Sequence, residues 1–224
     1  TVTIFVYWFA FAIGLRASNT VSGYPFFLWL IVGLIPWFYM SDMLTQGTES
    51  LRRYSYLVTK MKFPISTIPT FVSISKMIVH IILMVLVVII FAIFGYPPDV
   101  YMLQAFFYMI LMFAFFTVWA LFSSLIAAMS KDFLNLVKSF ITAFFWLSGI
   151  LWDANTITIP WLRRFLMLNP ITFLANGYRN CFIEHTWFWE QPKRLIYFAI
   201  SFTIMLLLAM WAYKKLRKEV ADVL

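Results

Sequence analysis

The sequence predicts an all-α polytopic membrane protein with six transmembrane helices, and three observations support this fold class. Of 224 residues, 63% are hydrophobic and only 12% are charged, whereas soluble domains are about half apolar and about a quarter charged. Several runs without Asp, Glu, Lys or Arg reach the length of about 20 residues that a helix needs to cross a bilayer. Basic residues cluster in the loop 47–69 and in the C-terminal tail, and such clusters mark the cytoplasmic side of membrane proteins.

The composition also excludes several classes of protein. A chain this apolar is not an intrinsically disordered protein, a coiled coil, a zinc module or a disulfide scaffold. Cys181 is the only cysteine, so no internal disulfide is possible. The net charge of +8 would suggest a nucleic-acid partner in a soluble protein. In a membrane protein it mainly marks orientation, so we expect no nucleic-acid partner.

Four charge-free runs are each long enough to cross the hydrocarbon core of a bilayer: residues 17–41, 77–98, 100–130 and 195–213. Residues 1–15 are also uncharged but slightly short, so we expect the sequence to begin inside or just before a first helix, with native sequence missing upstream. A helix over about 133–151 supplies the remaining crossing if Lys138 extends to the head groups. These segments form a single domain, residues 1–224.

The segment 154–192 is not predicted to cross the membrane. Proline and glycine interrupt it, and it carries three arginines: Arg163, Arg164 and Arg179. The positive-inside rule places the basic loop 47–69 and the basic C-terminal tail in the cytoplasm. Four crossings between them keep both on that side, whereas a fifth crossing would move the tail outside. The sequence therefore predicts an external re-entrant helical hairpin over about 154–180, with both termini in the cytoplasm.

A short amphipathic helix is predicted in the cytoplasmic loop, over about residues 50–63. Apolar residues recur there at helical spacing, basic residues lie largely on the other faces, and Pro64 and Pro69 end the helix. From these residues alone, the helix is either an anchor on anionic lipid or a docking element for a soluble partner. The chain has no nucleotide-binding motif and no ionisable relay through its spans, so uphill transport needs energy from another polypeptide.

No catalytic constellation is evident in the sequence. Lys76 and His80 lie one turn apart in a span and are interpreted as structural. Glu184 and His185 are adjacent and too few for a metal site. Two other classes stay open as alternatives. A membrane-bound glycosyl or acyl transferase requires polar residues clustered on one face, and a stand-alone channel works without any ATPase.

Three stretches together resemble the permease subunit of ABC-2 type exporters. They are WFYMSDMLTQGTESLRRYSYLVTKMKFPISTIP, AAMSKDFLNLVKSFITAFFWLSGILWD and LRRFLMLNPITFLANGYRN. The characteristic features are a KFPxxxxP pattern beginning at Lys62 and an NP pair, Asn169 and Pro170, that is followed by Tyr178 and Arg179. Within this family the polysaccharide exporters fit best, and the chain is most similar to the wall teichoic acid exporter permeases of Gram-positive bacteria.

This resemblance implies a multi-pass protein of the plasma membrane that works as a homodimer with a cytoplasmic ABC ATPase dimer. ATP and Mg²⁺ would bind the partner ATPase, and this chain would hold no cofactor, no metal and no catalytic site. The cargo would be a lipid-linked anionic polysaccharide, namely undecaprenyl-diphosphate-linked wall teichoic acid or a related polymer, which enters from the surrounding membrane lipid. An ABC-2 permease for O-antigen, drugs or small lipids stays open as the alternative.

The resemblance also implies two sets of functional residues. The helix at 50–63 would be the coupling helix that docks on the ATPase, with these contacts: Arg52, Arg53, Tyr54, Leu57, Lys60, Lys62 and Phe63. The hairpin at 154–180 would form an external gate on the substrate path, with these residues: Trp152, Arg163, Arg164, Asn169, Pro170, Tyr178 and Arg179. The three arginines would bind either the substrate's phosphates or lipid head groups.

Overall fold

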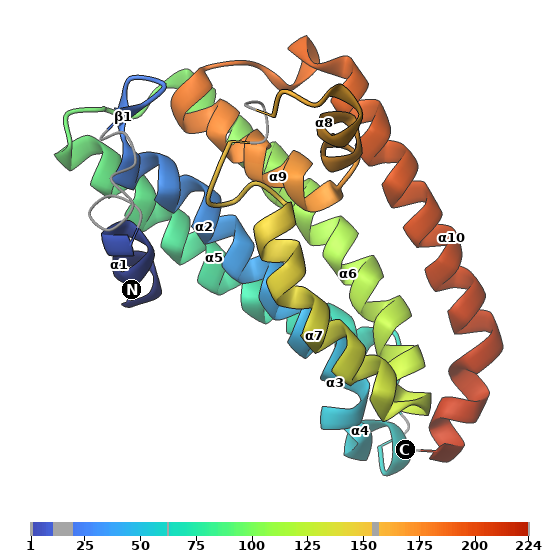
Figure 1. Cartoon of the computed structure of the whole chain (residues 1–224). Helices are drawn as coiled ribbons and strands as arrows, with labels where there is room; N and C mark the ends of the chain where they lie inside the picture. Colours follow the sequence, from blue (N-terminus) through green and yellow to red (C-terminus); the bar gives the residue numbers. More distant parts are fainter. Residues whose placement is uncertain (1, 11–19, 62, 154–156, 224) are drawn as a thin grey trace.

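The computed structural model describes residues 2–10, 20–61, 63–153 and 157–223, with side chains described up to residue 220. The chain folds as a bundle of long helices, with short helices and one small β-hairpin at its ends (Figure 1). Four helical stretches are long and apolar enough to cross a membrane: Phe26–Arg53, Thr67–Ile93, Val100–Met129 and Pro192–Val220. The four spans expected from the charge-free runs are therefore confirmed as helices.

The main helices of these stretches are α2 (Phe26–Asp42), α5 (Thr67–Ile93), α6 (Ala105–Met129) and α10 (Pro192–Val223). A π-helical turn (Met43–Gly47) and α3 (Thr48–Arg53) continue α2 without a break. The expected end of this span at residue 41 is therefore wrong. Thr45 and Thr48 donate their hydroxyls to carbonyl oxygens of the preceding turn, at 2.9 and 2.6 Å. These polar side chains are thus satisfied within the helix and do not end it.

The other two expected crossings correspond to shorter helices. These are α1 (Val2–Trp8) and α7 (Lys131–Leu147), with 7 and 17 residues. A helix of 17 residues is about 25 Å long at 1.5 Å per residue, slightly less than the hydrocarbon core. The chain is a multi-pass membrane protein by its four long apolar helices, and the count of six crossings stays a prediction.

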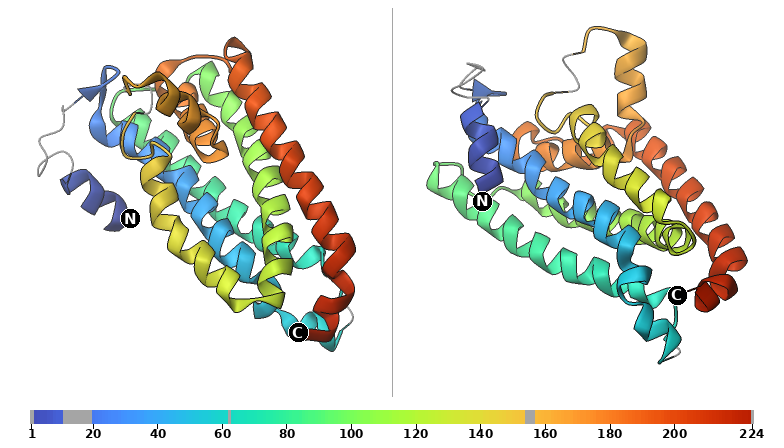
Figure 2. Two further views of the ribbon diagram at one scale, coloured as in Figure 1. Left: turned by 45° about the vertical axis from the view of Figure 1, so that its right-hand side comes forward. Right: turned by 60° about the horizontal axis from the view of Figure 1, so that its bottom comes forward.

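Helix α2 lies at the centre of the bundle. In its most apolar stretch 78% of the residues are buried, against 22–39% in the other three spans. Helices α1, α5 and α9 (Pro170–Arg179) pack around α2. Helix α6 packs between α10 and α3, and the three form the other side of the bundle (Figure 2). The apolar core is therefore organised around a helix that has almost no face left for lipid.

Different structural elements lie at the two ends of the bundle. Helix α4 (Ser55–Thr59) and the C-terminus lie at one end, and the β-hairpin and α8 (Pro160–Met167) lie at the opposite end (Figure 1). The basic loop after α3 and the basic tail thus share one end, as an even number of crossings between them requires. The assignment of this end to the cytoplasm stays a prediction.

A pair of short helices occupies most of the expected hairpin segment at 154–180. Helix α8 ends at Met167 and α9 begins at Pro170, so only two residues join them. Residues 154–156 lie outside the described residues. The re-entrant placement of the α8–α9 hairpin depends on the position of the bilayer and stays a prediction.

The helix expected over 50–63 is divided in two. Its first part is α3, the end of the long second span, and its second part is the short α4. Tyr54 separates them with φ −111° and ψ 29°, and its ring packs against Phe71 at a centroid distance of 5.0 Å. Burial of this ring turns the chain away from the axis of α3.

A two-stranded hairpin and short helical turns complete the structure. Strands β1 (Thr20–Val21) and β2 (Tyr24–Pro25) are joined by Ser22 and Gly23, whose φ angles are 51° and 81°. Two left-handed central residues are what a type I′ turn requires. The remaining turns are a 3-10 turn at Val100–Gln104, a π-helical turn at Asn180–Glu184 and a 3-10 turn at Phe188–Glu190.

The contact between α9 and α6 requires a glycine at position 177. A Cβ atom there would lie 2.2 Å from Cε1 of Tyr108, whose ring is buried. We expect Gly177→Ala to destabilise the protein by about 1–3 kcal/mol through overpacking, in spite of the better helix propensity of alanine. The thermal unfolding midpoint of the purified protein measures this effect. Adding Tyr108→Leu should restore part of the loss, and a single variant as stable as wild type would contradict the prediction.

Candidate functional site

The turn between α8 and α9 is fixed by Asn169 and Pro170. The Oδ1 atom of Asn169 accepts a hydrogen bond from the backbone N–H of Ile171 at 3.0 Å, and Pro170 is the first residue of α9. This is a typical N-cap followed by proline at a position that needs no N–H donor. Asn169 Nδ2 also donates to Ser148 Oγ at 2.9 Å. The NP motif therefore attaches the start of α9 to the end of α7.

Arg179, at the end of α9, is buried in the interior with only 4% of its surface exposed. Its guanidinium donates hydrogen bonds to the carbonyl oxygens of Gly149 and Ile150, both at 2.7 Å. The guanidinium carbon lies 3.6 Å from the centroid of the Trp29 ring. A Cβ at Gly33 would be 2.7 Å from Nη2 of Arg179, so a glycine is needed there. Arg179 thus joins α9, α2 and the segment after α7.

Tyr178 joins α9 to α5. Its hydroxyl lies 2.8 Å from Nε2 of His80, and both side chains are buried. A second polar chain lies nearby, in which Ser73 Oγ is 2.7 Å from Tyr39 Oη and 2.6 Å from Thr117 Oγ1. A polar group that is buried in an apolar interior without a hydrogen-bond partner destabilises the protein. These contacts therefore fix α2, α5, α6 and α9 relative to one another.

The remaining expected gate residues lie apart from Arg179. Trp152 is partly buried, packs against the core and donates its indole N–H to the carbonyl oxygen of Trp146 at 2.7 Å. Arg163 and Arg164 are exposed on α8. The structure thus brings together the residues of α9 and separates them from the arginines of α8. Contact of any of these residues with substrate stays a prediction.

A cluster of aromatic and polar side chains closes the end of the bundle where the β-hairpin lies. The rings of Tyr24 and Tyr96 are 4.5 Å apart, and Nε2 of His185 lies 3.5 Å from Oδ2 of Asp99. Partial burial raises the pKa of Tyr24 above its ordinary value, and the nearby Tyr96, Asp99 and Glu184 add to this shift. Tyr24 is therefore neutral at physiological pH. The cluster attaches the β-hairpin to the loop after α5 and to the end of α9.

The expected coupling residues have different surroundings at the opposite end. Arg52 donates to the carbonyl oxygen of Ala127 through Nε and to that of Ala128 through Nη2, the latter at 3.0 Å. It thereby caps the C-terminus of α6, where a cation is also favoured by the helix dipole. Arg53 and Lys60 are exposed. Tyr54, Leu57 and Phe63 are partly buried against the local apolar cluster, and Lys62 lies outside the described residues.

Two ion pairs flank this end of the bundle. Lys76 Nζ lies 3.0 Å from Asp42 Oδ2, which joins α5 to α2, and Lys138 Nζ lies 3.7 Å from Glu49 Oε2, which joins α7 to α3. The interpretation of Lys76 as a structural residue agrees with this pairing. Both acids lie on the long helix Phe26–Arg53. The basic residues of α5 and α7 thus support the helix that leads to α4.

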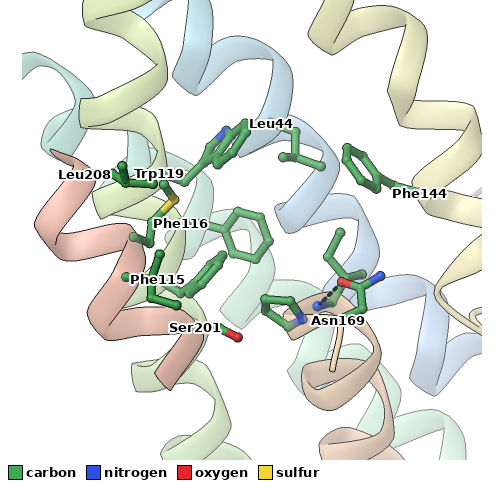
Figure 3. Close-up of a pocket in the computed structure, with 12 residues that line it drawn as sticks. Leu44, Phe115, Phe116, Trp119, Phe144, Asn169, Ser201 and Leu208 are labelled. Carbon is green, nitrogen blue, oxygen red and sulfur yellow. Dashed lines mark hydrogen bonds between the residues drawn. The ribbon is translucent and has the colours of Figure 1, made fainter. Parts of the chain in front are cut away.

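An apolar pocket of about 300 Å³ opens between four helices and the turn before α9 (Figure 3). Helix α6 contributes the rings of Phe115, Phe116 and Trp119, and Asn169 lies at one edge of the pocket. The remaining lining residues are Leu44, Phe144, Pro170, Ile171, Ser201, Ile204, Met205 and Leu208. A lining this apolar accepts hydrocarbon and does not stabilise a charged group.

Helix α7 carries a polar face that no described segment covers. Asn135, Lys138, Ser139 and Thr142 recur at helical spacing and are all exposed. The buried Leu134, Val137 and Phe145 lie on the neighbouring side of the helix, and the exposed side also carries Leu136, Phe140 and Trp146. Polar residues in a membrane helix usually face a protein interior or water rather than lipid. The sequence contained this signal in its 3.6-residue period, but only the structure shows that the face is left open.

Within the described residues, no group of three or more His, Cys, Asp and Glu side chains converges to hold a metal ion. The two buried hydrogen-bonded groups, Tyr39–Ser73–Thr117 and His80–Tyr178, do not line the apolar pocket. The arrangement is that of a helical bundle with an open polar face, an apolar side pocket and basic residues at both ends.

Comparison with known proteins gives two matches. The sequence profile of the ABC-2 type transporter family matches residues 1–183. The chain is also similar to the O-antigen export system permease protein RfbA of Myxococcus xanthus, with 23% identity over 223 residues, which cover 99% of this chain and 84% of that protein.

Replacement of Arg179 by lysine tests its structural role. Lysine keeps the charge but loses the planar fork that reaches two carbonyl oxygens and stacks on Trp29. We expect Arg179→Lys to lower the stability by about 1–3 kcal/mol, whereas Arg164→Lys, on an exposed site, should change it by less than about 0.5 kcal/mol. The thermal unfolding midpoint measures both. Normal stability combined with lost transport in Arg179→Lys would instead assign Arg179 to direct substrate contact.

Proposed function

The chain belongs to the ABC-2 type transporter family, and from this we propose that it is the permease subunit of an ATP-driven exporter of a lipid-linked polysaccharide. The relative from Myxococcus xanthus is named as an O-antigen export permease, which supports a polysaccharide cargo. The stretches MKFPISTIPT and LSGILWD, and GYRN followed by a Trp-rich segment, resemble wall teichoic acid exporter permeases and favour undecaprenyl-diphosphate-linked wall teichoic acid as the particular polymer. O-antigen is the alternative within the same class, and export of drugs or small lipids has less support.

The polar face of α7 is the observation that carries this proposal. Besides Lys138, which pairs with Glu49, the side chains of Asn135, Ser139 and Thr142 offer amide and hydroxyl groups along about seven residues of α7, a length of about 10 Å. One copy of the chain leaves this face open to lipid, which is unfavourable. A second copy facing the first would enclose it and create a polar path between the two subunits. The homodimer is therefore part of the proposal.

Energy for transport would come from a cytoplasmic ABC ATPase dimer that binds ATP and Mg²⁺. The docking surface would be the exposed side of α3 and α4, with Arg53, Tyr56 and Lys60 in contact with the ATPase. Arg52 is already bonded to α6, so it would support the surface from behind. Leu57, Phe63 and Tyr54 would hold α4 against the bundle.

Movement of the docking surface would reach the opposite end through a single rigid element. The continuous helix Phe26–Arg53 has 28 residues, a length of about 42 Å. Near its start, Trp29 and Gly33 contact Arg179 of α9. A tilt of this helix would therefore displace the α8–α9 hairpin, which would act as the external gate. The polymer would leave when the gate and the path between the subunits are open together.

Charge reversal of the exposed coupling residues tests the ATPase partner. Arg53→Glu combined with Lys60→Glu should abolish co-purification of the ATPase, because these side chains face the proposed partner. The matched control is Arg163→Glu combined with Lys193→Glu, which has the same change of charge at the other end. If both double variants lose the ATPase to the same extent, or if neither loses it, the assignment of Arg53 and Lys60 to the ATPase contact is contradicted. Arg52→Gln should lower the thermal midpoint as well, because it removes a helix cap.

A bulky side chain on α7 tests the path. Thr142→Trp should reduce ATP-dependent export of polymer about tenfold or more, which corresponds to about 1.4 kcal/mol in the barrier, while ATPase association stays normal. The control is Ile82→Trp, on the exposed apolar face of α5, which should export normally. Export is measured as polymer at the cell surface at equal protein level. Undiminished export by Thr142→Trp would exclude the face of α7 from the path.

The polymer class requires a separate measurement. Proteoliposomes that contain the permease and its ATPase are supplied with polyprenyl-diphosphate-linked poly(glycerol phosphate) or with a neutral glycan on the same lipid. Transport of the anionic polymer alone supports wall teichoic acid, and transport of the neutral glycan supports O-antigen. Transport of neither, with an active ATPase, would contradict polysaccharide export.

A further inference from the structure

A second cavity, distinct from the apolar pocket of Figure 3, lies between α8 and the start of α10. Its volume is about 880 Å³. We propose that this cavity binds the phosphate group of an anionic amphiphile. The cationic lining residues are Arg163, Arg164, Lys193 and Arg194. The other lining residues are Ile157, Thr158, Pro160, Met167, Leu168 and Tyr197.

Three of the four cations of this cavity are poorly compensated by the protein. Among the residues that the structure describes, no carboxylate lies within salt-bridge distance of Arg163, Arg164 or Lys193. Asp153 is the acid close enough to interact with Arg194, and Arg163 is close enough to repel it. Three or more positive charges around one cavity repel one another unless an anion lies between them. Arginine and lysine in such a cluster are typical ligands of phosphate.

The beginning of α10 adds to the positive potential. The helix starts at Pro192, so Lys193 and Arg194 lie in its first turn. Basic residues are unfavourable there, because the N-terminus of a helix already carries a partial positive charge and free N–H groups. An anion bound at this point would interact favourably with both the helix and the side chains. Lys193, which has no salt bridge to a described carboxylate, therefore lies where an anion is favoured.

The uncharged part of the lining indicates an amphiphile rather than free phosphate. Met167, Leu168 and Tyr197 present apolar surface next to the cations. A head group beside the arginines and a hydrocarbon chain along these residues would satisfy both parts of the cavity. Leu168 lines this cavity while Asn169 lines the apolar pocket. A bound amphiphile would therefore contact the turn that holds α8 and α9 together.

An anionic amphiphile with a phosphate group has two sources. One is an anionic phospholipid of the surrounding membrane, and the other is the polyprenyl phosphate that anchors the cargo. Only the second source rests on the proposed function. Binding is measured without the ATPase and without transport, so failure of the phosphate site and failure of polysaccharide export are separate results.

The experiment is native mass spectrometry of the full chain with three probes: dioleoyl phosphatidylglycerol, undecaprenyl phosphate and inorganic pyrophosphate. The test variant is Arg163→Gln/Arg164→Gln/Lys193→Gln. The control, Lys214→Gln/Lys215→Gln/Lys218→Gln, removes the same charge from exposed residues at the other end of α10. We expect the test variant to bind the amphiphiles at least about tenfold more weakly than wild type and the control to bind normally. Equal weakening in both variants, or no weakening, would overturn the proposal.

The comparison of probes identifies the ligand. Tighter binding of undecaprenyl phosphate than of phosphatidylglycerol assigns the cavity to the carrier lipid, and equal binding of the two assigns it to anionic membrane lipid. Pyrophosphate that binds as tightly as either amphiphile would overturn the role of the apolar residues. The thermal midpoint of each variant is measured beside these titrations. If the triple variant binds normally but is less stable than wild type, the proposal is also overturned. The three charges would then stabilise the fold and would not bind the ligand.

Discussion

The guanidinium of Arg179 is the contact on which the arrangement of the short helices depends. Burying a cation costs several kcal/mol unless its donors find acceptors and its charge is compensated. No carboxylate among the described residues forms a salt bridge with Arg179. The compensation comes from the carbonyl oxygens of Gly149 and Ile150, from Oδ1 of Asn176 and from the face of the Trp29 ring. Apart from Asn176, these partners lie on other segments, so the position of α9 depends on α2 and on the segment after α7.

Helix α2 forms the centre of the apolar core, and it also belongs to the long helix that connects the two ends of the bundle. The same continuous helix contacts Arg179 near one end and carries Arg53 at the other. Between these ends, Asp42 pairs with Lys76, and Tyr39 bonds to Ser73 of α5. Polar contacts of this kind have discrete partners, so a displaced helix must exchange whole contacts and does not deform gradually. These contacts hold the long helix in one position relative to α5.

The sequence predicted those features that depend on local composition. Charge-free length predicted the four long helices, and the prolines of 154–192 predicted an interrupted segment there, in which the structure shows that α9 begins at Pro170. The sequence did not distinguish the role of Arg179 from that of Arg163 and Arg164, because all three lie in the same predicted external segment. Their different fates depend on Trp29 and on the missing side chain of Gly33, which are about 150 residues away in the chain. In the same way, α2 and α5 are similarly apolar, and only packing decides that α2 is buried on nearly all sides. The two crossings expected at α1 and α7 stay predictions. The coupling residues, which rest on the family resemblance, also stay predictions.

The distribution of charge along the proposed path argues for a polymer rather than a compact cargo. Amide and hydroxyl groups such as Asn135, Ser139 and Thr142 form hydrogen bonds of about 0.5–1.5 kcal/mol net, whereas bonds to charged groups are worth about 1.5–3 kcal/mol. A chain of repeating sugars that must slide needs many weak and equivalent contacts, because one strong site would hold it in place. Lys138, the charged residue of this face, is paired with Glu49, and the other basic clusters lie towards the ends of the molecule, where a phosphate can be bound once at entry or exit. A small apolar cargo would need no polar face on α7, because it could remain in the lipid or in the pocket beside Trp119.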